Sequence, residues 1–490
     1  MNRFAKIVCT LGPSSHDEAI IKQMMKAGMN VARLNFSHGT HESHAELITL
    51  IRRSAKELGM PIAILQDLQG PKLRVGILPD EGVELKVGNI VNLYTIESNE
   101  PEHLADQIYL PLDVPNLARA VKPGNRILLD DGHLELKVIE VEGDTVKSRV
   151  VLGGILTSHK GVNLPGADLK IPIPTEKDIR DLEFGLSQGI DYVAISFVHK
   201  ASEIAVVREF INAKFPGKIR PGIIAKLERP EAIKNLHEII HEADGVMVAR
   251  GDLGVETSPQ EVPIMQKEII RSANQHAKIV ITATQMLESM IHNPRPTRAE
   301  ASDVANAVFD GTDAVMLSGE TASGNYPVEA VQMMDCIVRE AEEHRETWGR
   351  TSDFPREITL DDAISMTRAA CELAHDRSVT NVAVLTQTGR TALLMSKARP
   401  RVPIMGFTPK ENVYNLCSLY WGVIPAIIPF VDSLEKVVQT VDDFMQSEKK
   451  LKEGDQIVLI TGFPLPAIHL PNLALLHTIG EKVALAEKTT

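Results

Sequence analysis

Short apolar runs and amphipathic stretches alternate along the first 69 residues. Residues 6–12, 30–37 and 62–69 have the composition of buried strands, whereas residues 17–28 and 42–59 place their apolar side chains at helical spacing. A strand that is followed by a helix and then by another strand is typical of a parallel sheet. We therefore predict a βαβαβ opening in which helices cover the strands.

The alternation resumes at residue 175 and continues to residue 346. Helices are predicted at residues 176–188, 202–214, 230–243, 259–277, 298–309 and 327–346, and strands at 191–198, 222–228, 245–251, 278–284 and 313–318. With the opening, this gives roughly eight strands, each followed by a helix except where an insertion intervenes, which favours a (β/α)8 barrel, the TIM barrel, over an open sheet. We place the barrel at residues 1–69 and 171–348.

The inserted segment has a different pattern. Residues 70–170 show strands and glycine turns with little helical period, and the strands are predicted at 83–96, 126–131, 134–141 and 145–153. This pattern predicts a small inserted β-barrel domain that forms a lid on the larger barrel.

A second α/β unit follows a polar, proline-containing linker around residues 349–358. We place this unit at residues 356–480, with strands at 381–386, 402–408, 423–429, 456–461 and 474–479. The predicted fold class is therefore α/β: a TIM barrel with an inserted lid and a C-terminal α/β domain of regulatory character.

Composition and charge narrow the class of partner. Hydrophobic residues make up 43% and charged residues 24% of the chain, which is ordinary for a globular protein with several cores. The 52 basic and 65 acidic residues give a formal net charge of −13, and no basic tract is continuous. A nucleic acid is therefore not expected as the main partner.

The cysteines and the apolar runs indicate the compartment. The four cysteines lie far apart and form no Cys-x-x-Cys pair, so we interpret them as reduced, buried thiols. No apolar run approaches the ~18 residues that a membrane span needs. We expect a cytoplasmic protein without a membrane partner.

Polar residues gather at the predicted carboxyl ends of the barrel strands, where barrel enzymes place their active sites. In residues 30–37 the alternation of a strand puts Arg33, Asn35 and Ser37 on one face. Charged and amide groups inside a barrel are costly unless they are paired. The three residues are therefore either candidate ligand contacts or partners of one another.

The fifth and sixth barrel strands end in acidic residues. Lys226 and Glu228 share one face, and Asp252 follows the next strand, beside Glu228. A structural ion pair is the alternative interpretation of Lys226 and Glu228. Two neighbouring carboxylates repel unless a proton or a divalent cation lies between them, and oxygen ligands favour Mg²⁺. Gly251 lets an anionic oxygen approach the backbone N–H groups.

The insertion leaves the barrel just before Arg74, so this cation stands between the barrel mouth and the lid. Thr284 and Ser318 end the seventh and eighth strands. A lid that excludes water, together with a Mg²⁺ pair, Lys226 and Arg33, favours an enzyme that moves or binds a phosphate.

Several segments of the chain resemble pyruvate kinase. They are residues 6–13 (KIVCTLGP), 30–39 (NVARLNFSHG), 161–166 (GVNLPG) and 281–290 (ITATQMLESM). The resemblance covers nearly the whole chain, in the family's order. It implies the last step of glycolysis, in which the phosphoryl group of phosphoenolpyruvate passes to ADP to give pyruvate and ATP. It also implies Mg²⁺ as cofactor, with Mn²⁺ as an alternative.

The resemblance also implies roles for individual residues. Glu228 and Asp252 match the Mg²⁺ ligands; Arg33, Lys226, Gly251, Asp252 and Thr284 match substrate contacts; Asn35, His38, Arg74 and Lys160 match nucleotide contacts. Lys226, Arg33, Arg74, Thr284 and Ser318 are the implied catalytic residues. Thr284 and Ser318 are candidates for the relay that protonates the enolate, whose final donor stays open.

One position departs from many family members, which carry Glu where this chain has Lys72 and which depend on K⁺. The matching monovalent-cation pocket consists of Asn35, Ser37, Asp67 and the carbonyl of Leu68. We predict that the Lys72 ammonium substitutes for the cation, so that K⁺ is not required. An ordinary solvent-facing lysine is the alternative.

The C-terminal unit resembles the family's regulatory domain. Residues 386–391 (TQTGRT) form a strand-to-helix turn that could bind the phosphate of an effector, although a helix cap explains Thr388 and Thr391 almost as well. Residues 462–472 depart from the Gly/Ser-rich effector loop of familiar members. AMP, a sugar monophosphate and fructose 1,6-bisphosphate therefore stay open as effectors, and the resemblance implies a homotetramer.

Two other functions fit parts of the pattern. A Mg²⁺-dependent barrel aldolase or lyase would also use an acidic pair and an arginine on a pyruvate-like acid, but the lid and Arg74 argue against it. A catalytically silent metabolite sensor would keep the barrel, but it would not need Lys226, Glu228 and Asp252 intact.

Overall fold

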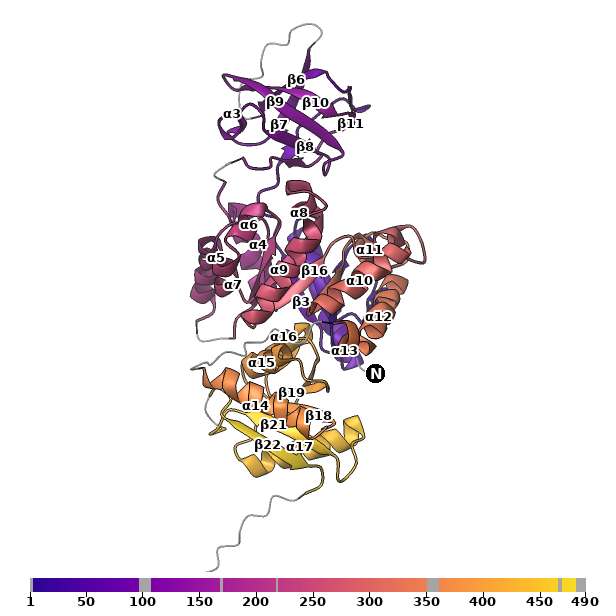
Figure 1. Cartoon of the computed structure of the whole chain (residues 1–490), viewed down its shortest axis with the longest axis vertical. Coiled ribbons are helices and arrows are strands. Elements are labelled where there is room, and N and C mark those ends of the chain that lie inside the picture. Colours follow the sequence, from indigo (N-terminus) through magenta and orange to yellow (C-terminus); the bar gives the residue numbers. More distant parts are fainter. Residues whose placement is uncertain are drawn as a thin grey trace, which may run out of the picture.

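Three bodies lie in line along the molecule (Figure 1). The computed structural model describes residues 3–96, 107–167, 171–216, 219–349, 361–465 and 469–481. A β domain occupies one end, a β/α barrel the middle and an α/β domain the other end. None of the helices in these ranges combines the length and the apolar character that a bilayer crossing needs.

The middle body is a closed parallel barrel, as predicted. Its strands are β1 (Lys6–Leu11), β2 (Val31–Asn35), β3 (Ala63–Asp67), β13 (Tyr192–Ile195), β14 (Gly222–Leu227), β15 (Gly245–Ala249), β16 (Ile279–Ala283) and β17 (Ala314–Leu317). Each barrel strand pairs with the barrel strand that precedes it, so that β13 pairs with β3 across the insertion, and β17 pairs with β1 to close the barrel. The strands are almost entirely buried, since their side chains fill the interior or pack under the helices.

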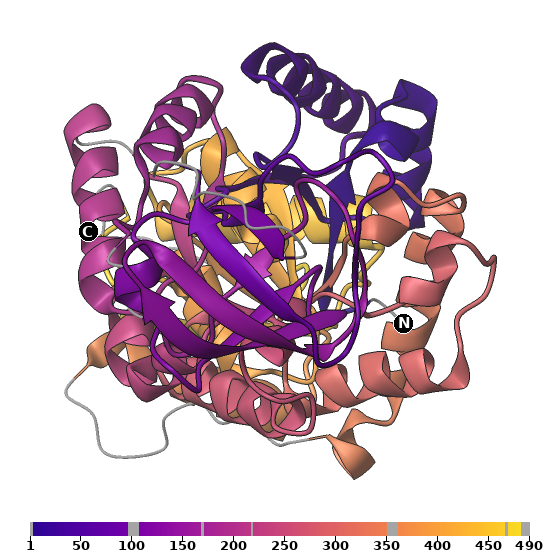
Figure 2. The same ribbon diagram turned by 90° about the horizontal axis from the view of Figure 1, so that it is seen from above.

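Helices surround the barrel (Figure 2). They are α1 (Glu18–Ala27), α2 (His41–Leu58), α4 (Glu176–Ser187), α5 (Ala201–Lys214), α6 (Pro230–Lys234), α7 (Leu236–Glu242), α8 (Arg250–Glu256), α9 (Val262–Gln275), α10 (Arg298–Asp310), α11 (Gly319–Ala322), α12 (Pro327–Glu343) and α13 (Arg345–Trp348), with short 3-10 turns at Pro13–Ser15 and Glu288–Ile291. Thr40, Thr175 and Thr297 each cap the following helix by accepting a backbone N–H bond. These caps explain why the predicted helices begin where they do.

Two predicted helices of the barrel are divided in the structure, and one predicted strand gives way to a helix. The helix expected at 327–346 forms α12 and α13, on either side of His344. The helix expected at 230–243 breaks at Asn235, whose side-chain amide donates to the His199 carbonyl at 2.7 Å. The strand expected at 245–251 ends at Ala249, and the chain turns at once into α8. The first turn of a helix, rather than a strand end, therefore carries Gly251 and Asp252.

The lid is a separate β domain, as expected. Its strands are β4 (Arg74–Val75), β5 (Val83–Leu85), β6 (Ile90–Thr95), β7 (Ile108–Asp113), β8 (Arg126–Leu129), β9 (Leu134–Glu142), β10 (Thr145–Leu152), β11 (Gly154–Leu156) and β12 (Val162–Asn163), with one short helix, α3 (Leu117–Ala120). Residues 83–96 form two strands rather than one, and the sequence did not predict β7. Figure 2 shows the lid over the end of the barrel, which is the end where β3 stops at Asp67.

The C-terminal body is an α/β domain. It contains α14 (Asp362–Asp376), β18 (Asn381–Leu385), α15 (Arg390–Ala398), β19 (Ile404–Thr408), α16 (Glu411–Leu416), a 3-10 turn (Cys417–Leu419), β20 (Val423–Ile427), α17 (Leu434–Lys449), β21 (Gln456–Thr461) and β22 (Leu473–Thr478). The sheet order is β20-β19-β18-β21-β22, and only β22 runs antiparallel to its neighbour. Apart from Gly349, the predicted linker at 349–358 lies outside the described residues.

Buried polar contacts join this domain to the amino end of the barrel. The Lys397 ammonium, at the end of α15, donates to Asp313 Oδ2 at 2.7 Å, and Asp313 immediately precedes β17. Arg399 donates to the other oxygen of Asp313 at 2.8 Å. Burial lowers the pKa of Lys397 to about 8, although Asp313 attracts its proton. Buried ion pairs therefore attach the C-terminal domain to the amino end of the barrel.

We expect Lys397→Met to lower the free energy of unfolding by about 3 kcal/mol, because removing one partner leaves a buried carboxylate partly uncompensated. Urea denaturation followed by the fluorescence of the buried Trp421 measures this change. The matched control is Arg401→Met, since Arg401 pairs with Glu346 across the same two domains with both side chains 66% exposed. Equal losses in the two variants would contradict the prediction.

Candidate active site

Buried charges cluster at the carboxyl ends of β2, β3 and β14. Asp67 accepts a hydrogen bond from Arg33 Nε at 2.6 Å and lies 3.2 Å from Lys226 Nζ. Lys226 Nζ lies 2.9 Å from Glu228 Oε1 and donates to Ser196 Oγ at 2.7 Å. Two cations and two carboxylates therefore alternate around one small volume.

These pairs fix the protonation of the cluster. Burial by itself lowers the pKa of Lys226, but the charges of Asp67 and Glu228 outweigh it and the pKa lies above its usual value. Burial raises the pKa of Asp67, but Lys226 and Arg33 outweigh that effect and the pKa falls. Lys226 is therefore an ammonium, and Asp67 a carboxylate, at neutral pH.

Glu228 follows β14, and Asp252 lies in the first turn of α8, just after the neighbouring strand β15. Glu228 accepts the Phe197 N–H at 2.6 Å, and Phe197 adopts the left-handed conformation (φ 58°). In the described part of the chain, no donor contacts the Asp252 carboxylate. Burial and then the charge of Glu228 raise the pKa of Asp252 to about 7, against the opposing charge of Lys226. The two carboxylates therefore repel each other.

This donor set fits a divalent cation. A cation between Glu228 and Asp252 would remove their repulsion, and carboxylate oxygens suit Mg²⁺. Within the described ranges, no group of three or more His, Cys, Asp and Glu side chains could hold a metal. Two protein ligands leave coordination positions free for oxygens of a substrate and water, which is the usual arrangement for Mg²⁺ in enzymes that act on phosphates.

The loops after β15 and β16 meet beside Asp252. The Gly251 N–H donates to Thr284 Oγ1 at 2.7 Å, and Thr284 is left-handed (φ 65°). Arg250 holds the two loops together by donating to the Thr284 carbonyl at 2.7 Å and pairing with Asp303 at 2.6 Å. The structure thus brings Gly251 and Thr284 into contact, and Asp252 follows Gly251 in the chain.

A hydroxyl without a partner lies at the end of β17. Ser318 Oγ is buried and has no hydrogen-bond partner in the described structure. The backbone N–H of Ser318 donates to Glu320 Oε2 at 2.7 Å, and Glu320 Oε1 accepts the Leu287 N–H at 3.0 Å. Glu320 therefore fixes the backbone around Ser318 and leaves its hydroxyl available.

The other predicted residues lie around this centre. Asn35 is opposite Asp67 in the register of β2 and β3, but Ser37 lies beyond the end of β2, where its N–H donates to Asn35 Oδ1 at 3.1 Å. Ser37 therefore belongs to a turn and does not share a strand face. Burial, and then the charges of Lys72 and Arg74, lower the pKa of His38. His38 thus lies near both cations.

Lys72 is half-buried between the lid and the barrel. Burial and then Arg74 lower its pKa, while Asp131 and Asp252 act in the opposite direction. Two further lid residues of the prediction are held inside the lid. Arg74 donates to the His159 carbonyl at 2.9 Å, and Lys160 pairs with Asp130 at 2.7 Å.

Comparison with known proteins gives one consistent result. Residues 2–331 match the family model "Pyruvate kinase, barrel domain", and residues 363–475 match "Pyruvate kinase, alpha/beta domain". A pyruvate kinase of Geobacillus stearothermophilus is 43% identical over 99% of this chain and 82% of its own length. One from Clostridium perfringens is 44% identical over 94% of this chain and 96% of its own. The chain belongs to the pyruvate kinase family.

A solved structure agrees with this assignment. A pyruvate kinase from Cryptosporidium parvum superposes with a TM-score of 0.88 at 34% identity, and the match covers 97% of this chain and 96% of the other. The chain is thus a phosphotransferase of the pyruvate kinase class, whose substrates are phosphoenolpyruvate and ADP and whose members generally use Mg²⁺.

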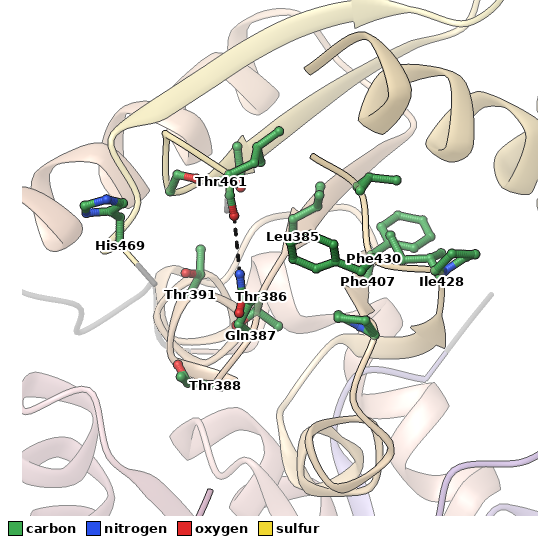
Figure 3. Close-up of a pocket in the computed structure, with 15 residues that line it drawn as sticks. Leu385, Thr386, Gln387, Thr388, Thr391, Phe407, Ile428, Phe430, Thr461 and His469 are labelled. Carbon is green, nitrogen blue, oxygen red and sulfur yellow. Dashed lines mark hydrogen bonds between the residues drawn. The ribbon is translucent and has the colours of Figure 1, made fainter. Parts of the chain in front are cut away.

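The pyruvate kinase C-terminal domain contains a cavity at the start of α15 (Figure 3). Thr386, Gln387, Thr388 and Thr391 gather on one side, and Phe407, Ile428 and Phe430 lie together on the other. Gly389, left-handed at φ 86°, donates its N–H to Thr386 Oγ1 at 2.9 Å. The cavity therefore has one polar and one apolar wall.

Sequence reasoning did not identify three residues of the active site. Ser196 binds Lys226, Phe197 orients Glu228, and Thr10 accepts a bond from Arg33 Nη1 at 2.9 Å. Ser196 and Phe197 follow a buried strand, as Ser318 does, and that position was the available signal. Thr10 lies inside β1 and gave no signal.

Asp67→Asn should lower the free energy of unfolding by about 3 kcal/mol, because Arg33 and Lys226 would lose their shared buried carboxylate. Chemical denaturation measures this loss. Asp130→Asn is the control, since it removes the carboxylate of the partly exposed pair with Lys160 and should cost less than about 1 kcal/mol. A stability loss no larger than that of the control would show that the cluster does not depend on Asp67.

Proposed function

We propose that this pyruvate kinase transfers the phosphoryl group at the carboxyl end of the barrel, with the cluster around Lys226 as its catalytic centre. The observation that carries the proposal is the pair Glu228 and Asp252, two mutually repelling carboxylates beside a buried ammonium, of which Glu228 follows β14 and Asp252 lies in the first turn of α8, just after the neighbouring strand β15. Such a pair attracts a divalent cation, and the ammonium attracts a phosphoryl group.

Glu228 and Asp252 would hold Mg²⁺, or Mn²⁺ in its place. When bound, the cation supplies positive charge beside the phosphoryl group and the enolate oxygen. Lys226 keeps its proton between two carboxylates and stabilises the negative charge of the phosphoryl group during transfer. Arg33, held by Asp67, contacts the phosphate from the opposite side of the cluster.

Gly251, Asp252 and Thr284 form the subsite for the substrate carboxylate. The Gly251 N–H and the Thr284 hydroxyl are 2.7 Å apart, so a carboxylate oxygen can take the place of their mutual bond. The enolate that remains after phosphoryl transfer must gain a proton at its methylene carbon. The unpartnered hydroxyl of Ser318 supports its role, with Thr284, in that proton relay.

The nucleotide lies between the barrel mouth and the lid in this proposal. Asn35 and His38 contact it from the barrel, and Arg74 and Lys160 from the lid. Both lid cations must then exchange their present partners, the His159 carbonyl and Asp130, for phosphate oxygens. A closed lid excludes water, so that ADP rather than water accepts the phosphoryl group.

Lys226→Met should lower kcat by about 100-fold or more, because one preorganised positive charge of the transition state is lost. Substrate binding should persist. An assay with phosphoenolpyruvate, ADP and Mg²⁺, coupled to the reduction of pyruvate, measures kcat, and calorimetry measures binding. Lys267→Met on α9, which removes a partly exposed pair with Asp310, is the control. Unchanged turnover in Lys226→Met would refute the assigned role, and absence of any turnover in the unmodified chain would favour a silent sensor.

Lys72 is proposed to replace the monovalent cation of K⁺-dependent relatives. The proposed pocket consists of Asn35, Ser37, Asp67 and the Leu68 carbonyl. The half-buried Lys72 and the fully buried Asp67 support this proposal, since a tethered ammonium needs no ion from solution.

Activity should therefore change less than about two-fold when KCl is added to a Tris or tetramethylammonium buffer. Lys72→Glu should create a K⁺ requirement, because it restores the acidic residue of the K⁺-dependent members. Initial rates with and without KCl test both expectations. A strong K⁺ requirement of the unmodified enzyme would remove the proposed role of Lys72.

The remaining proposals concern regulation and organisation. The cavity of Figure 3 is proposed to bind a phosphorylated effector through residues 386–391, with AMP, a sugar monophosphate and fructose 1,6-bisphosphate as candidates. We also propose a cytoplasmic homotetramer. Its catalytic barrel comprises residues 1–69 and 171–348, its lid residues 70–170, and its regulatory domain residues 356–480.

A further inference from the structure

A hydrogen bond joins the returning limb of the lid to the helix that carries Asp252. Asn163, at the end of β12, donates from Nδ2 to Glu256 Oε1 at 2.9 Å. Glu256 is the last residue of α8 and is only 5% exposed. Gly251 and Asp252 lie in the first turn of the same helix. A movement of β12 therefore acts directly on α8.

Glu256 also lies near Arg229, which follows Glu228 at the end of β14. Burial raises the pKa of Glu256, and the charge of Arg229 is the largest opposing influence. Arg229 follows Glu228 directly in the sequence. Its Nε atom is buried without a hydrogen-bond acceptor in the described structure, and its guanidinium lies over the Phe197 ring at 5.6 Å. Glu256 thus supplies negative charge to a cation that otherwise packs on an aromatic ring.

The contacts around Glu256 reach both carboxylates of the proposed cation site. On one side, Glu256 and Asp252 are four residues apart in α8 and therefore lie on the same helical face. On the other side, Arg229 is bonded to Glu228 through the backbone and packs on Phe197, whose N–H holds Glu228 Oε2. A shift of the Glu256 side chain would therefore change the distance between the carboxylates of Glu228 and Asp252.

We propose that Asn163 and Glu256 are positioning residues that couple docking of the lid to binding of the divalent cation. When Asn163 holds Glu256, α8 and the end of β14 are fixed relative to each other, and the two carboxylates face one ion. When the bond breaks, α8 is released and the cation is held less well. This inference rests on the proposed function, because it takes Glu228 and Asp252 as the cation ligands.

Coupling of this kind is reciprocal. If a docked lid strengthens cation binding, a bound cation must favour the docked lid by the same factor. A residue that only stabilises the fold would shift unfolding without changing either equilibrium. Cation affinity and lid protection are therefore the two measurements that separate a positioning role from a structural one.

The test uses the full-length chain without substrates and Mn²⁺ as the probe. Asn163→Ala, Glu256→Met and the double variant are titrated with Mn²⁺ by calorimetry or electron paramagnetic resonance. Each single variant should bind Mn²⁺ about five-fold or more weakly than the unmodified chain. The double variant should bind no more weakly than the weaker single variant, because both changes break one link. Additive losses would contradict a shared link.

Two matched variants control for general damage. Asn92→Ala removes a similar amide bond within the lid, from Asn92 Nδ2 to Gln107 at 2.8 Å. Glu342→Met removes another buried carboxyl, which binds the backbone of residues 4 and 5 at the opposite end of the barrel and whose pKa burial also raises. Both should leave Mn²⁺ affinity unchanged. A loss as large as that of Asn163→Ala would overturn the proposal.

Hydrogen exchange gives the second readout. Mn²⁺ should slow exchange of the amides around β12 in the unmodified chain, and this effect should disappear in Asn163→Ala, which is expected to fold because Asn163 ends a short strand. Unchanged Mn²⁺ affinity in a folded Asn163→Ala overturns the coupling.

Glu228→Gln distinguishes a failure of the lid coupling from a failure of the proposed cation site. If it abolishes Mn²⁺ binding while Asn163→Ala binds normally, only the coupling fails. If Glu228→Gln binds Mn²⁺ normally, the proposed cation site fails, and the coupling fails with it.

Discussion

The structure of the site depends on one ammonium held between two buried carboxylates. Lys226 lies between Asp67 and Glu228, at 3.2 and 2.9 Å, in a volume from which water is largely removed. Lys226 offsets the cost of burying both carboxylates, Arg33 adds a second positive charge beside Asp67, and the two carboxylates favour the charged form of Lys226. The same arrangement leaves Asp252 repelled by Glu228, and no donor among the described residues contacts its carboxylate. The charges of Asp67, Lys226 and Glu228 are thus paired with one another. The carboxylate of Asp252 has no ion-pair partner among the described residues, and a divalent cation fits there.

The two ends of the barrel differ in how completely their buried polar groups are paired. At the amino end, Lys397 and Arg399 from the C-terminal domain close a buried network on Asp313, and Glu342 binds the first residues of the chain. At the carboxyl end, the buried Ser318 hydroxyl has no hydrogen-bond partner among the described residues. Figure 1 shows the consequence, since the lid and the C-terminal domain lie at opposite ends of the barrel. Of these two domains, the lid is the one that lies at the end of the barrel where Lys226, Glu228 and Asp252 are placed.

Elements with strong periodicity were predicted within one to three residues, but junctions were not. The strand expected to run to residue 251 ends at Ala249, because the chain enters α8 there, and the helix expected at 230–243 breaks where Asn235 binds the His199 carbonyl. Both departures depend on contacts with other segments. Local sequence patterns contain no information on such contacts, so periodicity could not reveal them.

The sequence by itself determined the order of strands and helices, the barrel, the insertion point of the lid and the chemical types at the strand ends, because hydrophobic period and residue chemistry are local properties. Tertiary structure alone decided which charges neutralise one another. Arg33 could have faced a ligand freely, but it is bound to Asp67 and Thr10, and Glu256 showed no sign in the sequence of its contact with Asn163 across 93 positions. Pairing between distant residues depends on distances that exist only after the chain has closed the barrel and folded the lid over it.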